Sequence, residues 1–229
     1  MQKNNVIESD YDIFFDNIYQ NLIEKYPSDI THVDEKLVLK NRRVKLVQLN
    51  DNKEDRSLYN FLILDYYDLQ KQKGIKIDLE KIDLNENFSC ECLHYNHNNF
   101  PMFVGYNSKN EIVGMFGFRR SIDVNINNTN ITLQEISIRT KSDKKVGLSL
   151  YGMTSFFMLY GYAMLNRQHI FMETLPFLRD TMFHMIDLCE YEYYTTKNMF
   201  INVFNCTSLF DIWSSLRKDK FTTNIINKI

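Results

Sequence analysis

The stretch from residue 130 to residue 174 constrains the fold more than any other part of the chain. It places a strand-like segment, "NITLQEISIRT", before a long apolar segment, "YGMTSFFMLYGYAMLN", and a short apolar segment, "HIFMET", after it. The long segment is typical of a core helix, because its Met and aromatic residues recur at helical spacing. The flanking segments are typical of strands. The sequence therefore predicts a strand, a helix from about Gly147 to Asn166, and a second strand.

The segments on either side extend this pattern into a complete domain. We predict, in chain order, a strand at 43–49, a helix at 56–74, a polar loop with one helical turn at 75–99, a two-stranded hairpin at 101–121, a helix at 175–190, one or two strands at 191–204 and a terminal helix at 207–221. Gly74 is a suitable C-cap for the helix that precedes it. This order predicts an α+β fold, with a mixed, mostly antiparallel central sheet and helices on both faces.

The N-terminal segment is predicted to be a helical extension of this domain. "YDIFFDNIYQNLIEKYP" places its apolar residues near one helical face, and Pro27 follows the end of the helix. A chain of 229 residues with 44% hydrophobic content can bury one sizeable core. We therefore expect an N-terminal helical extension at 1–40 and a single domain at 41–229.

Composition and charge argue against several classes of partner and location. The 27 basic and 29 acidic residues leave a formal net charge of -2, so no overall field attracts nucleic acid. No apolar run reaches the ~20 residues that span a bilayer. "MQKNNVIESDYD" has no apolar core of a secretion signal, and four cysteines do not make a disulfide framework. We expect a cytoplasmic protein with no membrane span and no nucleic-acid partner.

The junction "SDKKVGLSL" between the first strand and the long helix predicts an anion site. A helix N-terminus carries backbone N–H groups without partners and the positive end of the helix dipole. Gly147 lets the backbone approach a ligand closely, Ser149 is small, and Lys144 and Lys145 add positive charge. The alternative is that Gly147 is a turn residue and the two lysines are solvated.

The order of elements and the run "KKVGLS" resemble the GCN5-related N-acetyltransferase (GNAT) superfamily. Its acyl-CoA loop reads Arg/Gln-x-x-Gly-x-Gly/Ala; Lys144 stands at the first position, Gly147 matches, and Ser149 stands at the last. The resemblance covers roughly residues 43–205. It implies a GNAT-like acyltransferase fold in which "LQEISIRT" and "HIFMET" are parallel neighbours that splay apart around the pantetheine arm.

The resemblance also implies a co-substrate and the residues that bind it. The co-substrate is acetyl-CoA or another acyl-CoA. The backbone of Ile136 and Ile138 would pair with the pantetheine amides. The pyrophosphate would be held by the backbone amides of Val146, Gly147, Leu148 and Ser149, beside Lys144 and Lys145.

The reaction implied is attack of an amine, on a small molecule or a protein, on the acyl thioester. Such a reaction needs a base and an acid. Glu135 is the candidate base; the alternative is an exposed charge or a partner of Arg139. His184 and Tyr191 are the candidate acids, and for His184 the alternative is a residue satisfied within helix packing.

Four potential zinc ligands lie close together in a polar segment. Cys90, Cys92, His94 and His97 lie within eight residues, but Cys-x-Cys is tighter than the usual structural zinc spacing and has no matching second pair. A polar loop accounts for these residues, and we expect no metal site.

Two other functions stay open. Acyl-homoserine-lactone and N-acyl amino acid synthases share the GNAT fold and carry an Arg after the third strand and Glu-x-x-Arg on the fourth. Arg119 and Arg120 end a predicted strand here, and "EISIR" spaces Glu135 and Arg139 one residue further apart, so we expect that pair on opposite sides of the strand. The second of these functions is that of a non-catalytic binding protein with a GNAT fold.

Overall fold

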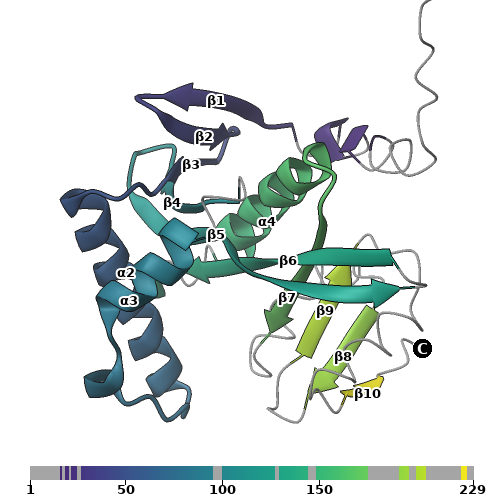
Figure 1. The fold of residues 1–229 in the computed structure, drawn as a ribbon. Coiled ribbons are helices and arrows are strands. Elements are labelled where there is room, and N and C mark those ends of the chain that lie inside the picture. The colour runs from purple at the N-terminus through teal and green to yellow at the C-terminus, as the bar shows by residue number, and fades with distance from the viewer. Residues whose placement is uncertain are drawn as a thin grey trace, which may run out of the picture.

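The computed structural model describes residues 27–94, 100–126, 129–143, 148–174, 191–195, 200–204 and 223–225, and helical residues 16, 19, 20 and 22–24. Ten strands form one sheet in the order β1-β2-β3-β4-β5-β6-β7-β9-β8-β10 (Figure 1). Every described neighbouring pair is antiparallel except β6 and β7.

The bounds of the elements are as follows. The strands are β1 (Asp29–Val33), β2 (Lys36–Lys40), β3 (Val44–Gln48), β4 (Met102–Asn107), β5 (Ile112–Ile126), β6 (Thr129–Thr140), β7 (His169–Thr174), β8 (Tyr191–Thr195), β9 (Phe200–Phe204) and β10 (Thr223–Ile225). The helical elements are α2 (Lys53–Gln72), the 3-10 turn η1 (Leu79–Lys81), α3 (Leu84–Phe88), the π-helical turn η2 (Ser89–His94) and α4 (Leu148–Leu165).

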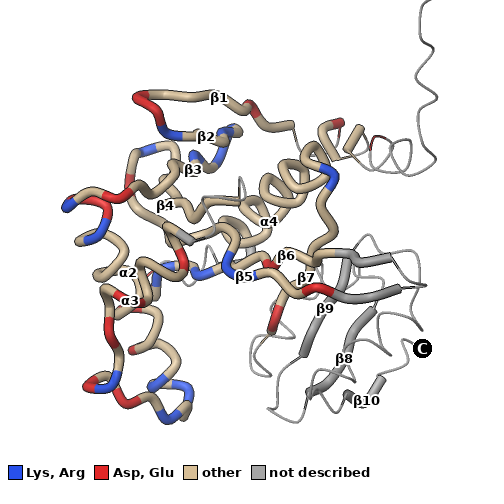
Figure 2. The backbone as a smooth tube through the Cα atoms, in the orientation of Figure 1, with Lys and Arg blue, Asp and Glu red and all other residues tan. Residues whose placement is uncertain are grey.

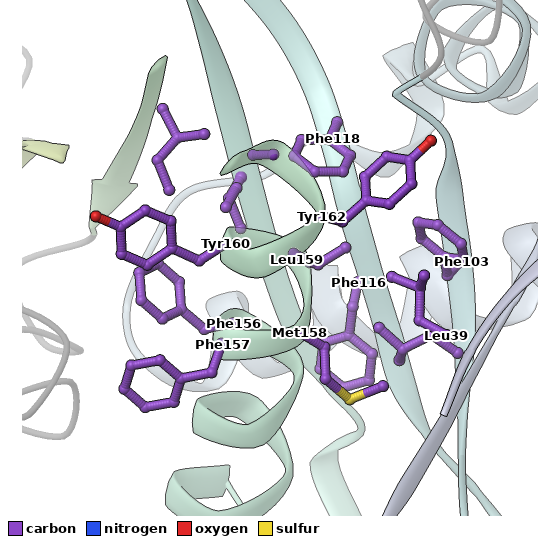
Figure 3. Packing of buried hydrophobic residues seen from close by; sticks show 14 of the residues in the cluster. Leu39, Phe103, Phe116, Phe118, Phe156, Phe157, Met158, Leu159, Tyr160 and Tyr162 are labelled. Atoms are coloured by element: carbon purple, nitrogen blue, oxygen red, sulfur yellow. The ribbon is translucent and has the colours of Figure 1, made fainter. Parts of the chain in front are cut away.

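Helices cover both faces of the sheet, as alternate residues of β4 show. Phe103 belongs to the cluster that α4 builds with Phe156, Leu159 and their neighbours (Figure 3). Met102 and Val104 point the other way, into the cluster that contains Tyr59 and Leu62 of α2. Because successive strand residues face opposite sides, one strand supplies both cores. The predicted α+β fold, with a mostly antiparallel mixed sheet and helices on both faces, is confirmed.

The helix α2 begins three residues earlier than the sequence predicted. The side chain of Asn52 caps it by accepting a hydrogen bond from the Asp55 amide at 2.8 Å. Asp55 also binds Lys36 at 2.6 Å, which ties the start of α2 to β2. At the other end Gly74 has a φ of +83°, so the predicted C-terminal glycine follows the helix in the left-handed region.

Part of the predicted N-terminal extension belongs to the sheet. Residues 29–40 form the hairpin of β1 and β2, and β2 pairs with β3. Leu37 and Leu39 are buried in the α4 cluster, whereas the described N-terminal helical residues Tyr19 and Leu22 pack on its outside. The sequence missed this hairpin because each strand has five residues and "DITHV" is mostly exposed.

Other predicted elements have different outcomes. The hairpin, the two strands at 191–204 and the strand at 169–174 are present as β4–β5, β8–β9 and β7. The helices predicted at 175–190 and 207–221 lie outside the described residues. Within the described part of the chain, no helix has the length and apolar character needed to cross a membrane.

Candidate functional site

The strands β6 and β7 form a fork. They are parallel and pair at three positions, Leu133 with His169, Gln134 with Ile170, and Glu135 with Phe171. Beyond these pairs β6 continues to Thr140 alongside β5, while β7 continues to Thr174 alongside β9. The two strands therefore separate after Glu135, as the resemblance implied for this pair of segments.

The backbone groups of Ile136 and Ile138 point into the open side of the fork. The amide of Lys141 donates to the carbonyl of Val113 at 2.9 Å, so position 141 faces β5. Hydrogen-bonding direction alternates along an antiparallel strand. Positions 139 and 137 therefore also face β5, and the peptide groups of Ile136 and Ile138 point toward β7. This is the direction that the predicted contact with a pantetheine arm requires.

The helix α4 starts close to the open end of β6. A Cβ atom added to Gly152 would lie 3.2 Å from Ile138 Cγ2 and 3.3 Å from Thr140 Oγ1, so the glycine permits this close contact. The buried hydroxyl of Thr140 has no hydrogen-bond partner in the described structure. Because of the close contact at Gly152, the start of α4 packs directly against β6, the strand that lines the fork.

The structure describes only some of the predicted site residues. Lys144, Lys145, Val146 and Gly147 lie outside the described residues, and so does His184. Leu148 and Ser149 are the first two residues of α4, and Tyr191 is the first residue of β8, opposite Val203 of β9. Their assigned roles stay predictions.

A β-bulge places two arginines against one glutamate at the closed end of the fork. Phe118 pairs with Ile136, but the next pair is Ser121 with Gln134, so Arg119 and Arg120 together oppose Glu135. Consecutive residues of a regular strand face opposite sides, whereas a bulge redirects a side chain. The side-chain amide Nε2 of Gln134 donates to the backbone carbonyl of Arg120 at 2.9 Å and so satisfies the bulged backbone.

Both oxygens of Glu135 accept hydrogen bonds from these arginines. Arg119 Nη1 donates to Oε1 at 3.3 Å, and Arg120 Nε donates to Oε2 at 2.8 Å. Arg120 Nη2 also contacts Glu173 on β7, and its guanidinium lies 5.8 Å from the centre of the Phe171 ring. Arg120 therefore bridges the two strands of the fork.

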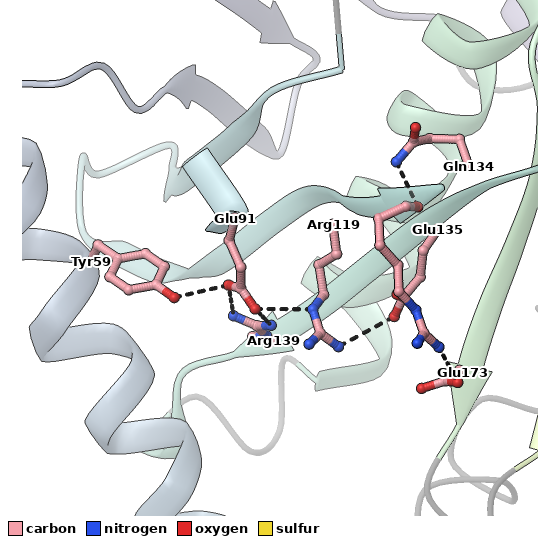
Figure 4. A network of polar contacts seen from close by, with 8 residues as sticks. Tyr59, Glu91, Arg119, Gln134, Glu135, Arg139 and Glu173 are labelled. Carbon is pink, nitrogen blue, oxygen red and sulfur yellow. Dashed lines mark hydrogen bonds and ion pairs between the residues drawn. The ribbon is translucent and has the colours of Figure 1, made fainter. Parts of the chain in front are cut away.

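The network continues to the helices on the same face of the sheet (Figure 4). Arg139 binds Glu91 of η2 through two hydrogen bonds of 2.7 Å. Arg119 Nε donates to the same carboxylate at 3.0 Å, and so does the hydroxyl of Tyr59 at 3.0 Å. Acidic and basic positions accordingly lie side by side along β5, β6 and β7 (Figure 2). We call this set of six charged residues the fork network: Glu91, Arg119, Arg120, Glu135, Arg139 and Glu173.

Burial and charge oppose each other in the fork network. Burial alone would raise the pKa of Glu91, but the charge and hydrogen bonds of Arg139, with the charge of Arg119, lower it to about 2. For Glu135 burial outweighs the attraction of Arg119 and Arg120, so its pKa is raised. Burial would lower the pKa of Arg120, but Glu135 and Glu173 raise it. Glu91 is therefore a fixed anion, whereas Glu135 is easier to protonate.

One expectation about the charged residues of β6 was wrong, and one alternative for Glu135 is not observed. Glu135 and Arg139 lie on the same face of β6, because residues four apart in a strand share a face. They are not partners of each other, because Arg139 binds Glu91 and Glu135 binds Arg119 and Arg120.

Sequence reasoning missed Tyr59, Glu91 and Glu173. Glu173 had a signal, because it lies in the strand predicted to flank the fork. Glu91 had none, because it belongs to a π-helical turn within a segment predicted as a loop. The neighbouring thiols differ in environment: Cys92 is buried in the α2 cluster, burial raises its pKa, and Cys90 is exposed.

Comparison with known proteins gives similarity at the level of structure. No protein-family model and no curated protein matches the sequence. An acetyltransferase from Streptococcus agalactiae is 12% identical, with a TM-score of 0.49 over 72% of this chain and 100% of its own. A GNAT-family acetyltransferase from Staphylococcus aureus is 14% identical, with a TM-score of 0.46 over 71% of this chain and 99% of its own. In its own strand order and its fork at β6 and β7, the chain has the α+β layout that its resemblance to the GNAT superfamily implied.

Proposed function

We propose that this chain is a divergent GNAT-type N-acyltransferase that transfers an acyl group, in the first instance acetyl, from acyl-CoA to an amine. The observation that carries the proposal is the fork between β6 and β7, with α4 packed at its open end and a charged network at its closed end. A fork of this kind can receive an extended thioester arm and bring its reactive end to polar groups.

The binding of acyl-CoA is assigned to the open end of the fork. Ile136 and Ile138 offer backbone groups toward β7, as an amide-containing arm requires. The first backbone amides of α4, with the predicted loop that precedes it, offer an N-terminal anion site for the pyrophosphate. Lys144 and Lys145 add charge there. The co-substrate supplies an activated thioester, and the protein binds and orients it.

Proton transfer is assigned to the closed end of the fork. The acceptor ammonium gives one proton to a base, its nitrogen lone pair attacks the carbonyl carbon, and the carbon–sulfur bond breaks with its electron pair on sulfur. A second proton passes from nitrogen to the thiolate, which leaves an amide and free CoA thiol. His184 and Tyr191 remain the candidate donors for any acid-assisted route.

We revise the assignment of the base. Glu135 was the predicted base, but each of its oxygens already accepts a hydrogen bond from an arginine and only 3% of its side chain is exposed. We therefore assign Glu135 to positioning Arg119 and Arg120. Glu173 lies across the fork, uses one oxygen for Arg120 and exposes 19% of its side chain, so it is the carboxylate that can receive a proton from an acceptor.

Both oxygens of Glu135 already accept hydrogen bonds from arginines. This also favours one alternative, a non-catalytic protein that binds acyl-CoA without transfer. The synthase-like alternative, with a longer acyl donor, differs from the main proposal in the preferred chain length. Both alternatives retain binding of a CoA thioester, so one set of measurements separates the three.

The test is calorimetric titration of the purified chain with acetyl-CoA and with a long-chain acyl-CoA, followed by an assay for CoA thiol released in the presence of amines. Micromolar binding that is lost in Gly147→Trp and kept in Gly161→Ala supports the site at the start of α4. Amine-dependent thiol release supports transfer, and binding without release favours the non-catalytic alternative. A folded protein that binds neither donor contradicts the proposal.

A further inference from the structure

The most exposed groups of the fork network are Arg119 and Arg120. The side chains of Arg119 and Arg120 are 37% and 40% exposed, whereas those of Glu91 and Glu135 are 13% and 3% exposed. The carboxylates thus lie behind the guanidinium groups and hold them in place. Such an arrangement presents donors of fixed direction to whatever enters from solvent, at little further cost in side-chain entropy.

Each of these arginines keeps donors unused. Arg119 binds through Nε and Nη1, and Arg120 binds through Nε and Nη2. Among the described residues no acceptor contacts Nη2 of Arg119 or Nη1 of Arg120. Two adjacent guanidinium groups with free N–H donors suit a planar carboxylate. The β-bulge is what brings them together, because a regular strand would send one of them to the opposite face.

The charge of the fork network restricts what can bind there. Three arginines and three glutamates cancel, so a purely anionic or purely cationic ligand would leave a net charge in a half-buried site. A zwitterion would not. Glu173 can bind the positively charged group of such a ligand, because only its Oε1 is engaged among the described residues and its side chain is partly exposed.

We propose that the acceptor is a small zwitterion of the α-amino acid type, whose carboxylate is bound by Arg119 and Arg120 and whose ammonium is bound by Glu173. This inference rests on the proposed acyltransferase function and names its substrate class. The ammonium gives one proton to Glu173, the nitrogen attacks the thioester carbon, sulfur leaves with the bonding pair, and a second nitrogen proton passes to it. The products are an N-acyl amino acid and free CoA thiol.

The test compares acceptors that differ only in the carboxylate. Leucine, phenylalanine, glutamate and lysine, each beside its carboxamide, are assayed with acetyl-CoA for release of CoA thiol. We expect at least one free amino acid to exceed its carboxamide by tenfold or more in kcat/KM. Binding of acetyl-CoA is titrated separately. If acetyl-CoA binds but carboxamides are acylated equally well, or no amino acid in the set is acylated, the inference is wrong, while the proposed binding of acetyl-CoA at the fork stands.

Variants of the two arginines test the residues themselves. We expect Arg120→Met and Arg119→Met to raise KM for the amino acid at least tenfold with little change in acetyl-CoA binding, and Arg119→Lys to recover part of the loss. Arg42→Met, at an exposed position outside the fork network, is the matched control. Circular dichroism shows whether each variant is folded; where a methionine variant is not, the lysine variant at the same position carries the comparison. Unchanged KM in a folded Arg119→Met and Arg120→Met pair overturns the assignment.

Discussion

At the scale of single residues, Glu91 accepts hydrogen bonds from two guanidinium groups and one phenol, so its removal has consequences for all three. Arg139 is buried, and without Glu91 its charge would have no carboxylate partner among the described residues. Breaking a buried ion pair on one side typically costs about 3–5 kcal/mol. We expect Glu91→Gln to lower the free energy of unfolding by about that amount, measured by urea titration. Asp68→Asn, on the exposed side of α2, is the control and should change stability little.

The same carboxylate predicts a dependence of stability on pH. The folded-state pKa of Glu91 is about 2 and its ordinary value is 4.5, so the group stabilises the fold fully above pH 4.5 and loses that contribution as the pH falls toward 2. Urea titrations at pH 7, 5, 4 and 3 should therefore show the gap between wild type and Glu91→Gln closing as the pH falls below 4.5. A gap that stays constant down to pH 3 would contradict the assigned pKa.

The fork network also shows what single residues reveal in advance. The sequence placed Arg119, Arg120 and Glu135 in the same predicted sheet, and the resemblance to the GNAT superfamily singled out Glu135 as the candidate base. It did not reveal their pairing. Pairing depends on one extra residue in β5, and the alternation of apolar and polar residues does not show which residues form the bulge.

At the scale of elements, α4 is apolar on all sides and contains two glycines with different surroundings. Among the described residues, a Cβ at Gly161 would meet no atom within 4 Å outside the glycine's own stretch of helix, and alanine is favoured over glycine in a helix interior by about 0.5–1 kcal/mol. We expect Gly161→Ala to raise the free energy of unfolding by that amount in urea titration. No change, or a loss, would mean that the space beside Gly161 is occupied.

Gly114 of β5 provides the opposite case. Its φ is +156°, and an added Cβ would lie 2.4 Å from the backbone oxygen of Arg139. Backbone on the neighbouring strand cannot move without disturbing the pairing of β5 with β6. We expect Gly114→Ala to lower the free energy of unfolding by more than about 1 kcal/mol. An unfolding midpoint equal to that of wild type would contradict this contact.

Elements with strong local signals were predicted well. The helix α2, the hairpin of β4 and β5, the helix α4 and the strand β7 all follow from periodicity and from turn residues such as Gly74. The segment η1–α3–η2 was predicted only as a loop with one helical turn, because its short helical pieces are held by contacts distant in sequence, such as Tyr59 with Glu91.

At the scale of the whole molecule, the hairpin of β1 and β2 forms one edge of the sheet. It buries Leu37, Val38 and Leu39, and removing it would expose both that apolar surface and the hydrogen-bonding edge of β3. We expect a chain that begins at residue 41 to be less stable in thermal unfolding than the full chain and to self-associate in size-exclusion chromatography. A monomeric 41–229 chain with an unchanged unfolding midpoint would support the domain boundary that the sequence predicted.

The whole-molecule plan was predictable in its class and partly in its order. The strand, helix, strand unit at 130–174 and the hairpin before it predicted a mixed sheet with helices on both faces. Residues 29–40 were missed because both strands have only five residues and β1 is mostly exposed. The geometry of the candidate site was not predicted. The contacts that join Glu91 of η2 to Arg139 of β6, and Arg120 of β5 to Glu173 of β7, exist only after the chain has folded.

The bulge at Arg119 and Arg120 shifts the phase of β5 relative to its neighbours. Before it, even-numbered residues such as Phe116 and Phe118 face α4; after it, the odd-numbered Ser121 stands opposite Gln134 and takes that side. A relative with one residue fewer here would keep an unbroken alternation and could present only one arginine to the glutamate. The number of residues between Phe118 and the return of regular pairing at Ser121 can therefore be counted in a related sequence. This number distinguishes chains able to hold a carboxylate between two guanidinium groups from chains that share only the fold.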